Sequence, residues 1–291
     1  MTALATRFAE IIRAYAAGDA YGVQFEFQPR RFDELPDSLA EVDGWPAGGV
    51  SDDTILSLMT LESLRVGADG ELLSATASAA EFKRRLMEAK DALRGLGPTT
   101  RAALGLPVKP EEEAMVGRSN GGLMRCALLG LAFADHDTRR NYVRALTEAT
   151  HAHPRAVEAA LVGSRLISDA VALGAAASIA DAVFDESPDF ADEIMGFEPT
   201  AEGVTLDPIE TLGAAIAACV SAQSTNDAFK IACGFGGDTD TTAALAGALF
   251  TARHPVGNGF ANIAWLNVVE WAEIPQLDAV AASLATLRLE K

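Results

Sequence analysis

The stretch Gly234 to Leu249 reads G-F-G-G-D-T-D-T-T-A-A-L-A-G-A-L and places a glycine-rich turn ahead of an apolar run. Apolar residues recur there at helical spacing, which predicts a helix from Thr239 to Arg253. Two aspartates and three threonines crowd the start of this helix, although one capping oxygen is enough for a helix N-terminus. We therefore expect a helical core and a polar site where this helix begins.

The same helical spacing runs through most of the 291 residues, whereas the alternation typical of strands is nearly absent. The sequence therefore predicts an all-α fold. With no shift in composition to mark a boundary, we expect residues 1–291 to form a single domain. The other expected helices are Leu4 to Ala16, Thr54 to Val66, Ala77 to Leu93, Leu123 to Ala134, Thr138 to Ala149, Arg155 to Leu173, Pro208 to Ala222, Ile263 to Ala272 and Gln276 to Leu287.

Charge and composition exclude several classes of function. The formal net charge of −18 argues against general binding of nucleic acid or of anionic membranes, because both would be repelled. No uninterrupted apolar run reaches the roughly 18 residues of a membrane span, and the N-terminus lacks a signal-peptide core. Cys126, Cys219 and Cys233 lack the spacing of a zinc or redox site. We expect a cytoplasmic protein with reduced thiols.

A second helix start is also rich in oxygen. Ser51-Asp52-Asp53-Thr54 precedes the apolar run I-L-S-L-M-T-L. Taken alone, either segment is explained by N-capping, in which such side chains satisfy free backbone N–H groups. Taken together, Asp52, Asp53, Asp238 and Asp240 supply four carboxylates that would repel one another unless cations lie among them. An all-oxygen set suits Mg²⁺, Mn²⁺ or Ca²⁺, and four carboxylates fit two ions better than one.

Glycines accompany the aspartates. Gly234, Gly236 and Gly237 remove side chains where backbone would approach a ligand, and they allow positive φ in the turn. A turn without any ligand is the simpler alternative. Three further segments contain residues that could join the site, although each alone has an ordinary structural interpretation: G-D-A-Y-G-V-Q-F-E (18–26), S-N-G-G-L-M-R (119–125) and T-H-A-H-P (150–154).

Five motifs in this order, G-D-A-Y-G, S-D-D-T, S-N-G-G-L-M-R, T-H-A-H-P and G-G-D-T-D-T, resemble those of the ADP-ribosylglycohydrolase family. The resemblance extends from about Arg13 to Leu249. It implies a compact orthogonal multi-helix bundle with a central dinuclear metal cleft that holds two Mg²⁺ or Mn²⁺ ions. It also implies cleavage of the bond between ADP-ribose and an acceptor, which is a protein side chain or a small molecule.

The resemblance assigns roles to individual residues. It implies Glu26, Asp53 and Asp238 as catalytic residues. The implied metal ligands are Ser51, Asp52, Asp53, Asp238, Asp240, Thr241 and Glu26. The implied substrate-binding residues are Asn120, Gly121, Gly122, His151, Gly234, Gly236 and Gly237.

Departures from the family pattern bear on the acceptor. Arginine-specific bacterial members resemble one another in an Asp and an Asn at the positions of Gly95 and Pro98. The carboxylate that would face a guanidinium is missing here, which argues against ADP-ribosyl-arginine. Two other functions stay open: a catalytically inactive ADP-ribose-binding relative, and an N-glycosidase acting on a free nucleotide or nucleoside. The loops 107–117 and 185–205 are expected to shape the acceptor side.

Overall fold

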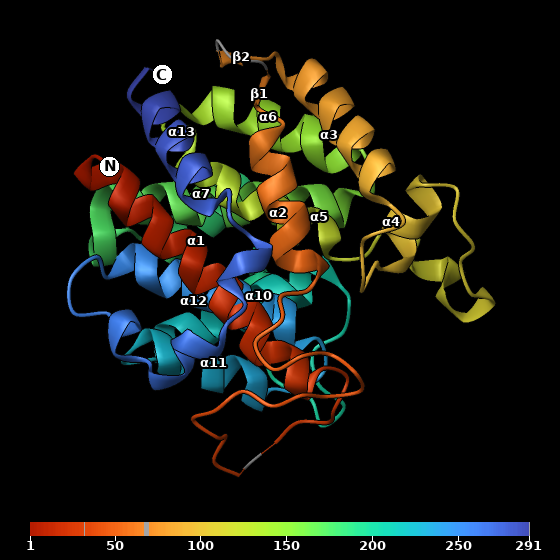
Figure 1. The fold of residues 1–291 in the computed structure, drawn as a ribbon, viewed down its shortest axis with the longest axis vertical. Helices are drawn as coiled ribbons and strands as arrows, with labels where there is room; N and C mark the ends of the chain where they lie inside the picture. The colour runs from red at the N-terminus through yellow and green to blue at the C-terminus, as the bar shows by residue number, and fades with distance from the viewer. Residues whose placement is uncertain (32, 67–69, 291) are drawn as a thin grey trace.

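The computed structural model describes residues 1–31, 33–66 and 70–290, and its architecture is all-α, as predicted (Figure 1). In these ranges the strands are limited to a short antiparallel hairpin of β1 (Arg65–Val66) and β2 (Glu71–Leu72). The α-helices are α1 (Ala3–Gly22), α2 (Asp52–Glu62), α3 (Ala75–Ala89), α4 (Pro98–Ala103), α5 (Gly121–Cys126), α6 (His136–Glu148), α7 (Pro154–Leu173), α8 (Ile179–Glu186), α9 (Ala191–Met195), α10 (Pro208–Ser221), α11 (Thr225–Gly234), α12 (Thr239–Arg253) and α13 (Leu277–Glu290). Short 3₁₀ turns join them: η1 (Val23–Phe25), η2 (Pro110–Met115), η3 (Ala127–Leu131), η4 (Gly174–Ala176), η5 (Phe260–Asn262), η6 (Ala264–Val268) and η7 (Trp271–Glu273).

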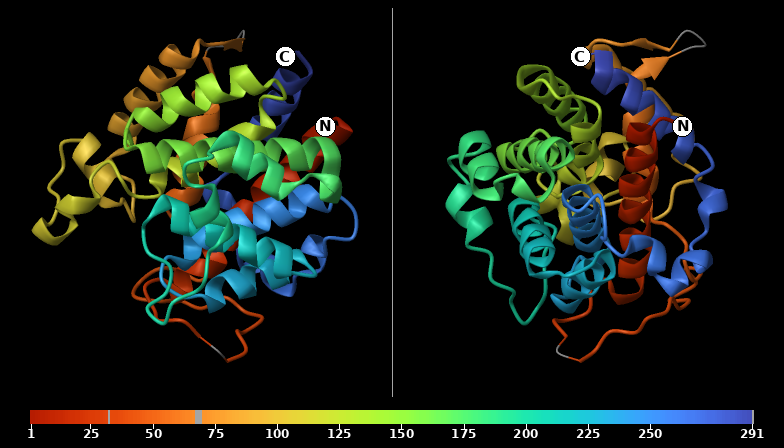
Figure 2. Two further views of the ribbon diagram at one scale, coloured as in Figure 1. Left: turned by 180° about the vertical axis from the view of Figure 1, so that it is seen from behind. Right: turned by 90° about the vertical axis from the view of Figure 1, so that its left-hand side faces the viewer.

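Helices α1 and α12 form the centre of the molecule and pack along each other (Figures 1 and 2). Two glycines of α1 make this close packing possible. A Cβ on Gly18 would lie 2.5 Å from the carbonyl oxygen of Ala243, and a Cβ on Gly22 would lie 2.4 Å from the Cα of Asp240. Both distances are far below van der Waals contact, so the C-terminal half of α1 fixes where α12 begins.

The remaining helices cover this central pair. Helices α10 and α11 pack on α12, α13 packs on α1, and α7 packs on η3, α5 and α6. The segment Pro154–Ala176, which is α7 with η4, has the length and mean hydropathy (1.4) of a membrane span. However, 61% of that window is buried inside the molecule, so neighbouring helices account for its apolar composition.

The helix predictions differ from the structure in several places. Helices α4, α8 and α9 were not expected, the predicted helix from Leu123 to Ala134 is divided between α5 and η3, and α2 ends at Glu62 rather than at Val66. Helix α11 was not expected, since its polar start and terminal glycine resemble a loop in the sequence. The predicted helix from Ile263 to Ala272 is instead a pair of 3₁₀ turns, η6 and η7, separated by extended backbone at Val269. The backbone N–H of Glu270 there donates to the carbonyl of Gly48, at 2.9 Å, so a tertiary hydrogen bond replaces a helical one.

The two predicted loops contain short helical turns. Residues 107–117 include η2, and 185–205 include the end of α8 and all of α9. Helix α4 and η2 project from one side of the molecule, where the chain is yellow (Figures 1 and 2).

Candidate active site

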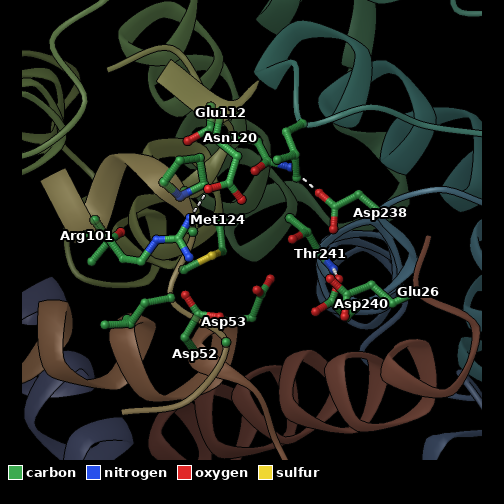
Figure 3. A pocket seen from close by; sticks show the side chains of 18 of the residues that line it. Glu26, Asp52, Asp53, Arg101, Glu112, Asn120, Met124, Asp238, Asp240 and Thr241 are labelled. Carbon is green, nitrogen blue, oxygen red and sulfur yellow. Dashed lines mark hydrogen bonds and ion pairs between the residues drawn. The ribbon is translucent and has the colours of Figure 1, made fainter. Parts of the chain in front are cut away.

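A cavity of about 270 Å³ lies where the N-termini of α2, α5 and α12 converge (Figure 3). The predicted motifs therefore meet in space, although they are far apart in the sequence. Of the predicted site residues, those that line the cavity are Glu26, Asp52, Asp53, Asn120, Gly121, His151, Asp238, Asp240 and Thr241. Those outside its described lining are Ser51, Gly122, Gly234, Gly236 and Gly237.

Asp19 of α1 holds the start of α2 in place. Its carboxylate accepts hydrogen bonds from the backbone N–H of Ser51 (3.0 Å), the N–H of Thr54 (3.1 Å) and the hydroxyl of Thr54 (2.5 Å). Asp19 is fully buried, and burial with the charge of Asp240 raises its pKa to about 7. Asp19 thus orients the segment that presents Asp52 and Asp53.

Ser51 acts as the N-cap of α2. Its Oγ accepts the backbone N–H of Asp53 at 3.1 Å. This bond gives the hydroxyl a capping role in the structure, and the ligand role that the family resemblance implied stays a prediction.

Three carboxyl groups face one another at the start of α12. Oxygens of Glu26, Asp238 and Asp240 lie within 4.8 Å of one another, with Asp238 and Asp240 buried and Glu26 half-buried. Burial, followed by the charges of Asp240, Asp52 and Asp19, raises the pKa of Glu26 to about 9. Burial and Asp240 also raise the pKa of Asp238 well above its usual range. Such shifts are expected where like charges crowd without counter-ions.

The two aspartates of α2 complete the acidic wall. Desolvation, followed by the charge of Asp240, raises the pKa values of both Asp52 and Asp53 well above the ordinary range. Asp53 Oδ1 is buried and has no hydrogen-bond partner. A buried carboxylate oxygen without a donor is costly, so this atom is suited to binding a cation.

These residues fit divalent cations. The donor set consists of carboxylate and hydroxyl oxygens without Cys or His, which is the chemistry that Mg²⁺ and Mn²⁺ prefer. The unpartnered Asp53 Oδ1 and the mutual repulsion of the carboxyl groups are both relieved by cations. The site can therefore bind metal, as the sequence predicted in general terms.

Asn120 fixes one of the acids. Its side-chain amide donates to Asp238 Oδ2 and to Thr211 Oγ1, the latter at 2.9 Å. Both hydrogens of the amide nitrogen are thereby used inside the protein. Asn120 is thus a positioning residue for Asp238, in addition to lining the cavity.

His151 supports the turn that carries Asn120. Its Nδ1 pairs with Thr150 Oγ1 at 2.7 Å and its Nε2 with Ser119 Oγ at 3.2 Å. Burial, and then the charge of Arg125, lowers the pKa of His151 well below its usual value, so the ring is neutral near pH 7. An added Cβ at Gly121 would lie 3.0 Å from this ring, and one at Gly122 would lie 3.1 Å from its Cβ. The glycines allow the imidazole to pack under the turn.

Two of the glycines before α12, Gly236 and Gly237, are required by chain packing. An added Cβ at Gly236 would lie 2.6 Å from the backbone N of Arg30, and one at Gly237 would lie 2.0 Å from the carbonyl oxygen of Val204. The N–H of Phe27 donates to the carbonyl of Gly237 at 2.7 Å, which sets the neighbouring Glu26 beside α12. Gly234 ends α11. Chain packing thus accounts for Gly236 and Gly237, whereas an added Cβ at Gly234 would lie 4.0 Å from Arg31 O. The predicted substrate-binding role of the three glycines stays a prediction.

Several lining residues were missed in the sequence, including Phe27, Thr100, Arg101, Glu112 and Met124. Phe27 follows Glu26 directly, has φ of 57° and is 70% exposed. Because Phe27 directly follows the predicted site residue Glu26, its position in the sequence could have indicated that it lines the cavity. Arg101 and Glu112 form an ion pair inside the cavity wall (Figure 3), and no local pattern marks either of them.

The motifs assembled in this cavity agree with a comparison over the whole chain. A family model for ADP-ribosylglycohydrolases matches residues 1–290. The chain belongs to the ADP-ribosylglycohydrolase family. A solved structure described as "ADP-ribosylglycohydrolase-related protein complex" is similar to it, with a TM-score of 0.75 and 26% identity over 99% of both chains. Among curated proteins, none matches this chain.

The suspected family is thereby confirmed, and ADP-ribosylglycohydrolase membership accounts for the all-α architecture. Hydrolysis of ADP-ribose linkages is the activity of this family in general, and the family is typically metal-dependent.

Proposed function

We infer that this protein is a divalent-cation-dependent hydrolase that cleaves the glycosidic bond between ADP-ribose and its acceptor. The observation that supports it most is the convergence of Glu26, Asp238 and Asp240, with oxygens within 4.8 Å, beside the unpartnered Asp53 Oδ1. A structural relic of the fold would have no need of these buried acids in one cavity, because they destabilise one another.

Seven residues would hold two Mg²⁺ or Mn²⁺ ions: Ser51, Asp52, Asp53, Asp238, Asp240, Thr241 and Glu26. Bound there, the ions would neutralise the acids and supply Lewis acidity beside the ribose. The carboxylates of Glu26, Asp53 and Asp238 would face the anomeric carbon, where an oxocarbenium-like charge develops during glycosidic cleavage. One of these carboxylates would orient and deprotonate the attacking water.

The chain's other residues would keep this arrangement fixed. Asp19 holds the start of α2, and Asn120 holds Asp238. Asn120, Gly121, Gly122, His151 and the glycines before α12 would border the ADP-ribose, as the family resemblance implies.

The substrate would be an ADP-ribosylated protein or an ADP-ribose-containing small molecule. Position 95 bears on the acceptor, since Gly95 has φ of +79° and an added Cβ would lie 2.8 Å from Asp52 Oδ1. A carboxylate side chain there would crowd Asp52, which supports an acceptor other than arginine. The three cysteines are free and buried, which supports action in the reducing cytoplasm.

Substitution of Asp240 tests the proposal. Asp240→Asn keeps the shape of the side chain and removes the charge that acts on Glu26, Asp52, Asp53 and Asp238. We expect loss of ADP-ribose release with an unchanged circular dichroism spectrum. The matched control is Asp137→Asn, since the side chain of Asp137 is 96% exposed. Wild-type turnover by Asp240→Asn would refute the proposal.

A further inference from the structure

The cavity carries one cationic side chain among its described lining residues, and that residue is Arg101 of α4. Its lining otherwise contains six carboxyl groups, those of Glu26, Asp52, Asp53, Glu112, Asp238 and Asp240. His151, which also lines the cavity, is neutral because burial lowers its pKa. Among the described lining side chains, Arg101 is therefore the one that attracts an anionic ligand, together with any bound cations.

The hydrogen-bonding capacity of Arg101 is incompletely used. Its Nη2 donates to Glu112 Oε2, while its Nε is buried and has no partner. A guanidinium has five N–H donors, and leaving a buried one unpaired is unfavourable. Figure 3 shows this side chain entering the cavity across from Glu26 and Asp240. The position of the residue is fixed by the backbone, because the N–H of Leu106 donates to the Arg101 carbonyl at 2.8 Å.

Glu112 occupies the place that an anion would take at Arg101. It lies on η2, a turn without any buried residue, so a small movement of η2 would break no core contact. Glu112 also has other partners, because its Oε2 accepts the N–H of Lys109 at 3.2 Å and its Oε1 lies 4.0 Å from Lys109 Nζ. The carboxylate can therefore leave Arg101 without becoming unpaired.

We propose that Arg101 is the phosphate-recognition residue of this cavity and that Glu112 is an internal counter-ion which the substrate's diphosphate displaces. The inference rests on the proposed function, since ADP-ribose carries a diphosphate next to the ribose that the acids would hold. A planar guanidinium binds two phosphate oxygens at once, and it would then satisfy the N–H groups that Glu112 leaves unused.

Calorimetric titration of the purified protein in Mg²⁺ with ADP-ribose, ADP and adenosine tests this assignment. Arg101→Gln should lower the affinity for ADP-ribose and for ADP by about 10- to 100-fold, the range for charge-assisted hydrogen bonds. It should leave the affinity for adenosine unchanged. Glu112→Gln removes the competing charge, so it should raise the affinity for both diphosphates by about 3- to 10-fold. Arg101→Lys keeps the charge without the fork and should give an intermediate affinity.

The matched control is Arg94→Gln. Arg94 lines a neighbouring cavity, pairs with Glu273 at 3.3 Å and is 54% exposed, so all three affinities should stay unchanged. A general loss of structure in Arg101→Gln would also abolish the thermal stabilisation by Mg²⁺, which the proposal expects to be retained.

Unchanged ADP-ribose affinity in Arg101→Gln, or equal weakening of adenosine and ADP, would overturn the assignment and leave the hydrolase proposal intact. Diphosphate binding that depends on Arg101 in a protein without turnover would overturn the hydrolase proposal alone. A wild-type protein that binds neither ADP nor ADP-ribose would overturn both.

Discussion

Replacement of Gly22 by alanine should damage the acidic centre from outside the cavity. The added Cβ would lie 2.4 Å from the Cα of Asp240, 2.5 Å from the carbonyl oxygen of Thr239 and 2.6 Å from the N of Asp240. Ordinary contact begins near 3.4 Å, so the start of α12 must move by about 1 Å. All three neighbours are backbone atoms, and no side-chain rotation can relieve the contact.

The energetic cost follows from these distances. Overpacking costs about 1–3 kcal/mol, and rigid backbone on the opposing side places Gly22→Ala near the upper end, at about 2–3 kcal/mol. The unfolding entropy is about 2.1 cal/mol/K per residue. For 291 residues this gives about 0.6 kcal/mol per degree, so the melting temperature should fall by about 3–5 °C. A 1 Å shift of Asp240 also exceeds the tolerance of about 0.5 Å for a preorganised site, so Mg²⁺ should no longer stabilise the variant.

Differential scanning fluorimetry with and without Mg²⁺ measures both effects. Gly234→Ala is the matched control, because its added Cβ has Arg31 O at 4.0 Å as its nearest neighbour. Replacing this helical glycine should raise the free energy of unfolding by about 0.5–1 kcal/mol, and the variant should still be stabilised by Mg²⁺. A Gly22→Ala variant that melts and binds Mg²⁺ like the wild type would refute the packing argument.

Three further outcomes are expected. Mg²⁺ at about 100 times its Kd should stabilise the wild type by about 2.7 kcal/mol for each site that it fills, or about 4–5 °C per site by fluorimetry, whereas Asp53→Asn should lose most of this shift and Asp137→Asn should keep it. Phe27→Gly should raise the free energy of unfolding by up to about 1 kcal/mol in urea titrations, because Phe27 is exposed at a φ of 57°, whereas Glu41→Gly in an exposed loop should lower it. His151 stays neutral when folded and takes a proton below pH about 6.5 when unfolded, so its contribution is complete above that pH and falls by up to about 1.4 kcal/mol per unit below it. His151→Gln should flatten this decline between about pH 6.5 and 5, and an equally steep decline in the variant would exclude His151 as its source.

Local sequence patterns predicted the elements whose apolar spacing is regular. Helix α12 begins at Thr239 and ends at Arg253, as expected, because glycines precede it and a continuous apolar run defines it. The segment Ile263–Ala272 was predicted as one helix because its buried residues Trp265 and Val269 also recur at a spacing of four. A hydrogen bond to Gly48 decides the backbone there, and a partner so distant in the sequence is invisible to local spacing.

The four aspartates of the site could be predicted because they are concentrated at two helix starts. The functions of the residues that support these acids could not be predicted, because those functions depend on contacts between segments that are distant in the sequence. Asp19 lies in the segment 18–26, which alone has an ordinary structural interpretation, yet its carboxylate accepts hydrogen bonds from residues 32 and 35 positions away. The role of Arg101 likewise becomes evident only from its ion pair with Glu112 and its position in the cavity lining. Gly236 and Gly237 were expected to admit a ligand, and added Cβ atoms there would meet the backbone of segments that are distant in the sequence.

The most direct test of the central claim is ADP-ribose release from a panel of ADP-ribosyl-serine, ADP-ribosyl-arginine, O-acetyl-ADP-ribose and α-NAD, each with Mg²⁺, with Mn²⁺ and with EDTA. The acidic centre predicts release from at least one substrate other than ADP-ribosyl-arginine, and it predicts that EDTA abolishes this release. Release that continues undiminished in EDTA, or no release from protein that binds ADP-ribose, would contradict the account.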